Sequence, residues 1–184
     1  MLKAAGIDAD VLVSGVDEAV VRLDDAGALS LALARMKASA VATRVPADAG
    51  TLVLGCDSVL DFGGRILGKP HDAAEATRRW RDMRGKSGVL YTGHHLVELA
   101  TGKSAEAVGA TRVHFADVTD EEIDAYVATE EPLHVAGAFT LDGLGGAFVE
   151  RIEGDSGNVI GLSLPLLRHL LRELGISIID LWNR

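Results

Sequence analysis

Apolar positions along the chain follow two periods, one helical and one typical of strands. Residues 28–43 have helical spacing, with one apolar stripe made of Leu29, Leu33, Met36 and Ala40. Residues 51–54 (TLVL) are a short apolar run that ends at Gly55, which is typical of a buried strand. Residues 88–99 and 104–116 predict two further strands around the turn ATGKS.

Capping and turn residues mark where other elements begin and end. Residues 72–84 open with DAAE and residues 119–127 with TDEE, and both strings are helix N-terminal caps. The pair Gly63-Gly64 predicts a hairpin turn within SVLDFGGRILG. A last helix follows Pro165 and ends at Gly175. Helical and strand patterns alternate, so we predict an α/β fold with residues 1–184 as a single domain.

Composition limits the class of partner and the compartment. Apolar residues make up 48% of the chain and aromatic residues 4%, which predicts a sizeable aliphatic core. The net charge of −9 disfavours nucleic acid and anionic membranes as partners. The single cysteine, Cys56, excludes an internal disulfide, and no apolar stretch has the length of a membrane span or signal peptide. We therefore expect a cytoplasmic protein.

Two conspicuous patterns lack the context that their chemistry requires. The run GDSG around Ser156 resembles the nucleophile segment of chymotrypsin-like proteases, but Asn158 replaces the next glycine, and those enzymes have a β-barrel and a Ser-His-Asp triad. We interpret this segment as a glycine-rich turn before the last helix. The pair His94-His95 lies on a predicted strand, where adjacent side chains point to opposite faces, so a packed or solvated pair is favoured over a zinc site.

Two carboxylates and two lysines remain as candidates for chemistry. Asp57 follows the strand TLVL and is either a functional carboxylate or the cap of the hairpin turn. Lys37 has no acidic neighbour at helical spacing, so its ammonium either reaches solvent or meets phosphate in a cleft. Lys69 is held extended by Pro70. Glu18 belongs to SGVDE, which is either a metal-binding strand end or a solvated loop.

Four stretches together resemble the Maf family of septum-formation inhibitor-like nucleotide pyrophosphatases. They are SGVDE, GCDSVLDFGGRILGKP, RGKSGVLYTGHHLV and the long block from EEIDAYVATEEPLH to GDSGNVIGLSLPLL. The resemblance covers nearly the whole chain and is greatest to actinobacterial members. It implies a fold related to inosine triphosphate pyrophosphatases, with an elongated mixed β-sheet flanked by helices and two lobes around a cleft.

The resemblance also implies an activity and roles for the candidates. The activity is hydrolysis of a nucleoside triphosphate, canonical or modified, between its α- and β-phosphates, by a homodimer that requires Mg²⁺ or Mn²⁺. Asp57 matches the catalytic carboxylate and would bind metal together with Glu18. Lys37 and Lys69 match phosphate-facing lysines. The alternative class is a non-catalytic nucleotide-binding regulator linked to cell division.

Two further positions bear on the choice of nucleotide. Family members of the dTTP/UTP type have a threonine after the catalytic aspartate and a glutamine in the glycine-rich segment; here the residues are Ser58 and Asp142. Asp142 only accepts hydrogen bonds, so it suits a base edge rich in N–H donors, such as guanine. The chain as given begins at Met1, without the strand and Ser-x-Ser-Pro-Arg loop with which family members begin. Either the natural start lies upstream of Met1, or, if the chain is complete as given, we expect crippled catalysis and lower stability.

Overall fold

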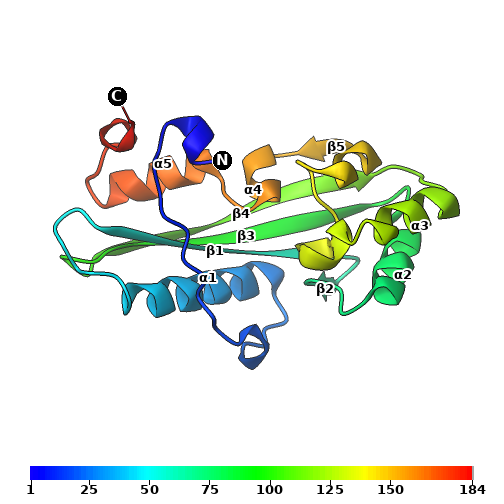
Figure 1. The fold of residues 1–184 in the computed structure, drawn as a ribbon, viewed down its shortest axis with the longest axis horizontal. Helices are drawn as coiled ribbons and strands as arrows, with labels where there is room; N and C mark the ends of the chain where they lie inside the picture. The colour runs from blue at the N-terminus through cyan, green and yellow to red at the C-terminus, as the bar shows by residue number, and fades with distance from the viewer. Residues whose placement is uncertain (184) are drawn as a thin grey trace. The chain divides into compact units, whose positions relative to one another are not determined.

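The computed structural model describes residues 1–183 and has an α/β fold (Figure 1). The strands are β1 (Leu52–Phe62), β2 (Arg65–Leu67), β3 (Ser87–Glu98), β4 (Ser104–Phe115) and β5 (Val149–Glu153). The α-helices are α1 (Ala26–Ala42), α2 (Ala73–Met83), α3 (Asp120–Ala128), α4 (Ser156–Ile160) and α5 (Leu164–Glu173). The predicted α/β class is confirmed.

The strands form one sheet in the order β2-β1-β3-β4-β5. β1 pairs antiparallel with β2, with Leu60 opposite Leu67, and β4 pairs antiparallel with β5, with Val113 opposite Ile152. The resemblance implied a mixed sheet flanked by helices, and the sheet found here is antiparallel and flanked by helices. β5 and the short helix α4 were not predicted from the sequence.

Local signals located most elements correctly. Asp72 caps α2 by accepting a hydrogen bond from the Glu75 amide, and Thr119 opens α3 with a complete capping box. Gly63 and Gly64 form the hairpin turn with φ angles of 59° and 79°, which glycine adopts without steric cost. The strand expected over 51–54 instead continues to residue 62, because polar residues after Gly55 interrupt the apolar pattern but not the backbone pairing.

The chain divides into two compact units. Unit 1 comprises Met1–Asp57, Gly93–Gly109 and the described residues from Leu162 onward, and unit 2 comprises Ser58–Thr92 and Ala110–Gly161. In unit 2, the fully buried Trp80 on α2 makes edge-to-face contacts with Phe115 and Tyr126 and donates its indole N–H to the Ala138 carbonyl at 2.7 Å. This core fixes α2 and α3 against β4.

In unit 1, α1 and α5 cover opposite faces of the sheet (Figure 1). α5 buries Leu167, Leu170 and Leu171 against Leu96 of β3. α1 instead packs mainly through small residues. Of the predicted apolar stripe, Leu33 is buried, and Leu29, Met36 and Ala40 are only half-buried. The buried residues of α1 are Ala26, Ser30, Leu33, Ala34 and Ala38.

Glycines in the sheet explain why α1 presents its small residues. A Cβ added to Gly55 would lie 2.3 Å from the Ala34 carbonyl oxygen, and one added to Gly93 would lie 2.4 Å from the Ser30 carbonyl oxygen. The helix backbone therefore lies directly against the strands, where only small side chains fit. The helical spacing of apolar residues could not identify this buried face of α1, because that spacing shows which residues are apolar and not which are small.

Candidate functional site

Three residues predicted from the sequence meet in unit 1. Lys37 on α1 donates a hydrogen bond to Asp57 Oδ1 in β1, and its Nζ lies 2.7 Å from Oε1 of Glu18, the first residue of a short 3₁₀ helix (Glu18–Val20). The Asp57 side chain is 9% exposed, that of Lys37 24% and that of Glu18 45%. We call Glu18, Lys37 and Asp57 the carboxylate–lysine cluster. It opens to solvent on the Glu18 side and is buried on the Asp57 side.

The close packing of α1 on β1 creates this cluster. A Cβ on Gly55 would lie 2.8 Å from the Ala38 amide nitrogen, so the helix backbone beside Lys37 is fixed against the strand. Asp57 lies two residues beyond Gly55, on the same strand face, because side chains alternate along a strand. The lysine side chain therefore reaches the carboxylate directly from the helix.

Two alternatives for these residues are thereby excluded. Lys37 has no acidic partner on its own helix, as expected, but its partners come from distant segments and it does not simply extend into solvent. Asp57 is not the hairpin cap, because Asp61 takes that role by accepting a hydrogen bond from the Gly64 amide at 2.9 Å. The sequence alone could not have shown which aspartate caps the turn.

The charges of the cluster alter the protonation of its neighbours. Burial alone would lower the pKa of Lys37, but the hydrogen bonds that its ammonium donates to Asp57 and Glu18, together with the negative charges of these carboxylates, outweigh it, so the pKa is raised. Burial, with a contribution from the Asp57 charge, raises the pKa of the Cys56 thiol to about 12. Lys37 is therefore a fixed cation at neutral pH, and Cys56 is a protonated thiol unsuited to nucleophilic attack.

We expect the raised pKa of Lys37 to couple stability to alkaline pH. Because the pKa is higher in the folded state, the stabilisation is complete below the unfolded value of about 10.4 and is lost as pH rises through the folded value. The difference in unfolding free energy between wild type and Lys37→Met should therefore shrink between pH 9 and pH 12, as measured by urea unfolding. A difference that stays constant over this range would contradict the coupling.

The other three predicted site residues, Ser58, Lys69 and Asp142, belong to unit 2. Lys69 is exposed, and the backbone on either side of it is fixed. The Gly68 carbonyl accepts hydrogen bonds from Arg79 Nη1 at 2.6 Å and from the Gly137 amide, and the His71 amide donates to Glu75 at 2.8 Å. Arg79 and Glu75 also form an ion pair at 2.6 Å. Glu75 and Arg79 were not predicted to hold this segment. Their spacing of four residues along one helix, which allows an ion pair, was the signal that the sequence offered.

Asp142 is exposed on a glycine-rich loop that a single carboxylate holds in place. Glu131 Oε1 accepts hydrogen bonds from Tyr126 Oη at 2.9 Å, Thr140 Oγ1 at 2.6 Å and the Gly145 amide at 3.0 Å. Its Oε2 accepts one from the Leu144 amide at 3.0 Å. Burial opposes ionisation, but these donors outweigh it and lower the pKa of Glu131 to about 2. Sequence reasoning missed Glu131 because its partners lie on other segments.

We expect Glu131→Gln to destabilise the protein by about 2 kcal/mol at pH 7, because an amide group replaces one acceptor oxygen and the charge is lost. The folded pKa is lowered, so the advantage of wild type should be complete above the unfolded value of about 4.3 and should fall between there and pH 2. Urea unfolding at pH 7 and pH 3 measures this. The control is Glu130→Gln, an exposed neighbour; equal effects of the two substitutions at pH 7 would refute the role of Glu131.

The carboxylate–lysine cluster also contains the carboxylates predicted to bind a metal ion. Among residues 1–183, no group of three or more His, Cys, Asp or Glu side chains could hold a metal by itself. Asp57 and Glu18 offer hard carboxylate oxygens, and both contact the Lys37 ammonium. Mg²⁺ in nucleotide enzymes is commonly held by one or two carboxylates together with substrate phosphates. The donor set therefore fits this ion only in company with an anionic substrate.

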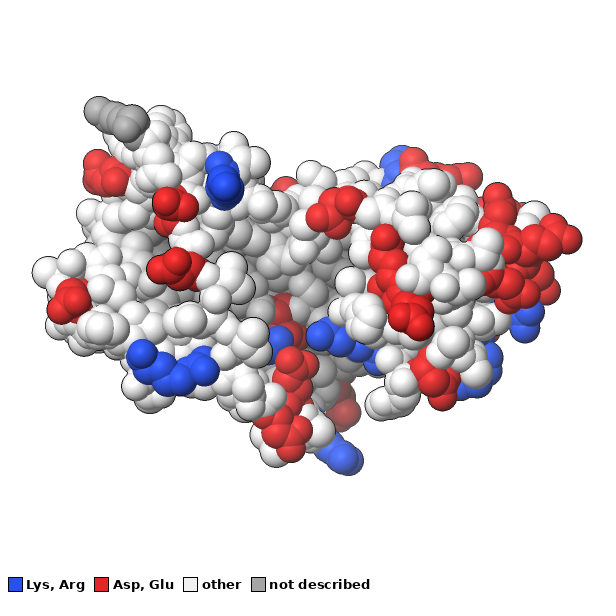
Figure 2. Space-filling model, in the orientation of Figure 1, with Lys and Arg blue, Asp and Glu red and all other residues white. Residues whose placement is uncertain are grey.

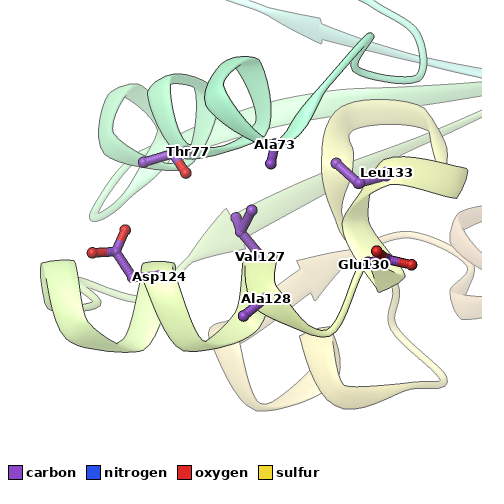
Figure 3. A pocket seen from close by; sticks show the side chains of 7 residues that line it. All are labelled: Ala73, Thr77, Asp124, Val127, Ala128, Glu130 and Leu133. Carbon is purple, nitrogen blue, oxygen red and sulfur yellow. The ribbon is translucent and has the colours of Figure 1, made fainter.

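A separate pocket lies in unit 2, between α2 and the segment that begins with α3 (Figure 3). Its lining includes Ala73 and Thr77 from α2 and Asp124 and Val127 from α3, and Glu130 follows α3. It contains none of the predicted site residues. Two acidic side chains and no basic one line it, so its charge opposes a polyphosphate.

The rejected patterns have structural explanations. His94 is fully buried and its Nε2 accepts the Ser163 amide hydrogen at 2.9 Å, while His95 Nδ1 lies 3.1 Å from Glu106, so the pair is packed as predicted. Ser156 is exposed on the first turn of α4. The expected glycine-rich turn is thus partly a short helix, capped by the Asp155 side chain through the Gly157 amide at 2.9 Å.

Surface charge and hydropathy add two observations. Acidic side chains are spread over the face shown in Figure 2, as the net charge of −9 predicts. Within residues 1–183, none of the helices has both the length and the apolar character needed to span a membrane.

The chain therefore combines an α/β fold, an antiparallel sheet and a carboxylate–lysine cluster. Comparison with known proteins identifies the family to which it belongs. The family model described as Maf-like protein matches residues 1–174. A nucleoside triphosphate pyrophosphatase of Salinispora tropica is 65% identical over 100% of this chain and 82% of its own length. Proteins of the same name from Streptomyces coelicolor and Microcystis aeruginosa are 57% and 50% identical, each over 99% of this chain and over 88% and 92% of their own lengths. The chain belongs to the Maf family.

Proposed function

We propose that this protein is a metal-dependent nucleoside triphosphate pyrophosphatase. It adds water across the bond between the α- and β-phosphates and releases a nucleoside monophosphate and pyrophosphate. The observation that carries the proposal is the carboxylate–lysine cluster, in which a mostly buried carboxylate, a fixed ammonium and a second, exposed carboxylate meet. The relatives named nucleoside triphosphate pyrophosphatase support the same activity.

Each residue of the cluster has a distinct role in the proposed reaction. Asp57 accepts the proton of the attacking water, and its carboxylate is oriented by the hydrogen bond from Lys37. Lys37 supplies positive charge where negative charge accumulates on the phosphates. Asp57 and Glu18 would hold Mg²⁺ or Mn²⁺. When bound, such an ion neutralises phosphate charge and acidifies water.

The residues of unit 2 are assigned to the substrate. Lys69 binds phosphate from its fixed backbone segment, and Ser58 and Asp142 contact the nucleoside. The cytoplasmic location and the homodimer are also part of the proposal.

A nucleotide panel with a matched metal control tests the function. Canonical ribo- and deoxyribonucleoside triphosphates and 7-methyl-GTP are incubated with the protein and Mg²⁺, or with a chelator, and pyrophosphate and orthophosphate are measured separately. We expect pyrophosphate with at least one nucleotide, and none when the metal is chelated. Nucleotide binding without turnover across the panel would instead support the non-catalytic regulator, and release of orthophosphate would place the cleavage elsewhere.

A further inference from the structure

The ammonium of Lys37 contacts both carboxylates that are assigned to the metal ion. It donates a hydrogen bond to Asp57 Oδ1, and its Nζ lies 2.7 Å from Glu18 Oε1. These three side chains come from three segments: β1, α1 and the 3₁₀ helix that begins at Glu18. In the structure, a cation of the protein itself therefore holds oxygens of both carboxylates.

The two contacts of Lys37 differ in how far water reaches them. The side chain of Asp57 is 9% exposed, whereas that of Glu18 is 45% exposed. Water and salt weaken an exposed ion pair, so the contact with Glu18 is readily exchanged for another ion. The mostly buried contact with Asp57 is screened much less. The Lys37–Glu18 pair is therefore the exchangeable one, and the Lys37–Asp57 pair is the persistent one.

The charges of the cluster oppose either ligand when it arrives alone. A divalent metal ion without phosphate competes with the Lys37 ammonium for the same carboxylates, and the two cations repel each other. A phosphate without metal competes with Glu18 for the ammonium and is repelled by both carboxylates. When the two ligands arrive together, the metal ion offsets the carboxylate charge and the phosphate offsets the ammonium charge. Each ligand then removes the obstacle to the other.

We propose that Lys37 and Glu18 form an exchangeable ion pair that makes the metal ion and the substrate phosphates bind together and not separately. Glu18 turns from Lys37 to the metal ion, a phosphate takes its place on the ammonium, and Lys37 keeps its hydrogen bond to Asp57. This inference rests on the proposed function and adds a coupling between its two ligands. Such coupling is reciprocal, so each ligand raises the affinity for the other by the same factor.

Binding of Mn²⁺ in the absence of any phosphate tests the metal side of the exchange. Free Mn²⁺ is measured by electron paramagnetic resonance in titrations of the wild type and of Lys37→Met. The variant loses the competing ammonium and keeps both carboxylates, so its affinity for Mn²⁺ should rise about tenfold. The control is Arg44→Met, which removes the same charge from a residue whose guanidinium donates to the Val13 and Ala40 carbonyls. Its affinity should stay within about twofold of wild type.

Binding of pyrophosphate in metal-free buffer tests the phosphate side, with calorimetry as the measurement. Glu18→Gln removes the charge that competes for the Lys37 ammonium, so the affinity for pyrophosphate should rise about fivefold, while the affinity for Mn²⁺ alone should not rise. The matched control is Asp17→Asn, the same change of charge in the preceding residue. Asparagine can still accept the hydrogen bond that Asp17 receives from the Ala19 amide at 3.0 Å. This control should change the affinity for pyrophosphate by less than about twofold.

The outcomes separate this inference from the proposed function, because neither titration needs turnover. If wild type hydrolyses no nucleotide but both variants bind more tightly as stated, the proposed function fails and the exchange holds. If Lys37→Met binds Mn²⁺ no more tightly than Arg44→Met, or Glu18→Gln binds pyrophosphate no more tightly than Asp17→Asn, the exchange is overturned. Should Lys37→Met fail to fold, the pair Glu18→Gln and Asp17→Asn decides alone, since both changes lie on exposed residues.

Discussion

Asp57→Asn should lower the rate of pyrophosphate release by about a thousandfold, in line with the loss of a general base. The variant keeps the size and shape of the side chain, and asparagine can still accept the hydrogen bond from Lys37. It loses the basic oxygen that takes the proton from water and one of the two carboxylates that would hold Mg²⁺. Nucleotide binding should survive, because the two lysines assigned to phosphate are untouched.

Single-turnover kinetics with excess enzyme would locate this effect in the chemical step. The control is Asp61→Asn, a substitution of the same kind in the same strand, at the aspartate that caps the hairpin turn. It should keep near wild-type turnover and lose a little stability. If Asp57→Asn hydrolyses nucleotides as fast as Asp61→Asn does, the general base lies elsewhere in the protein.

The sequence predicted the helices and turns that are determined by residues close together in the chain. The caps at Asp72 and Thr119 were found because each depends on residues three positions apart in one helix. The hairpin turn was found because Gly63-Gly64 suits the positive φ angles that such a turn requires. By contrast, β5 has a pattern too short to be distinguished from a loop, and its pairing with β4 depends on a distant segment.

The sequence was enough to single out residues of the site, but not to predict how they contact one another. Asp57 and Lys37 stood out because a carboxylate at a strand and a lysine without a local partner need an explanation. Their contact required the approach of α1 to β1, which depends on glycine and alanine and therefore leaves no apolar signal. Glu131 was missed for a related reason, since its four donors come from three separate segments.

Gly55→Ala should destabilise the protein by about 2–4 kcal/mol, at or above the usual cost of overpacking. The new methyl group would lie 2.3 Å from the Ala34 carbonyl oxygen and 2.9 Å from Ala38 Cβ. The first contact is with helix backbone, so a rotamer change cannot relieve it and α1 has to move away from β1. The same displacement carries Lys37 away from Asp57, so turnover should fall even in the folded protein.

Urea unfolding and turnover measured well below the melting temperature separate these two effects. Gly68→Ala is the control for stability, because no atom lies within 4 Å of its added Cβ and its φ is not positive; its unfolding free energy should stay within about 0.5 kcal/mol of wild type. Ala38→Gly added to Gly55→Ala should give little rescue, since the contact with the Ala34 carbonyl remains. If Gly55→Ala proved as stable and as active as wild type, the close packing of α1 on β1 would not be what positions Lys37 against Asp57.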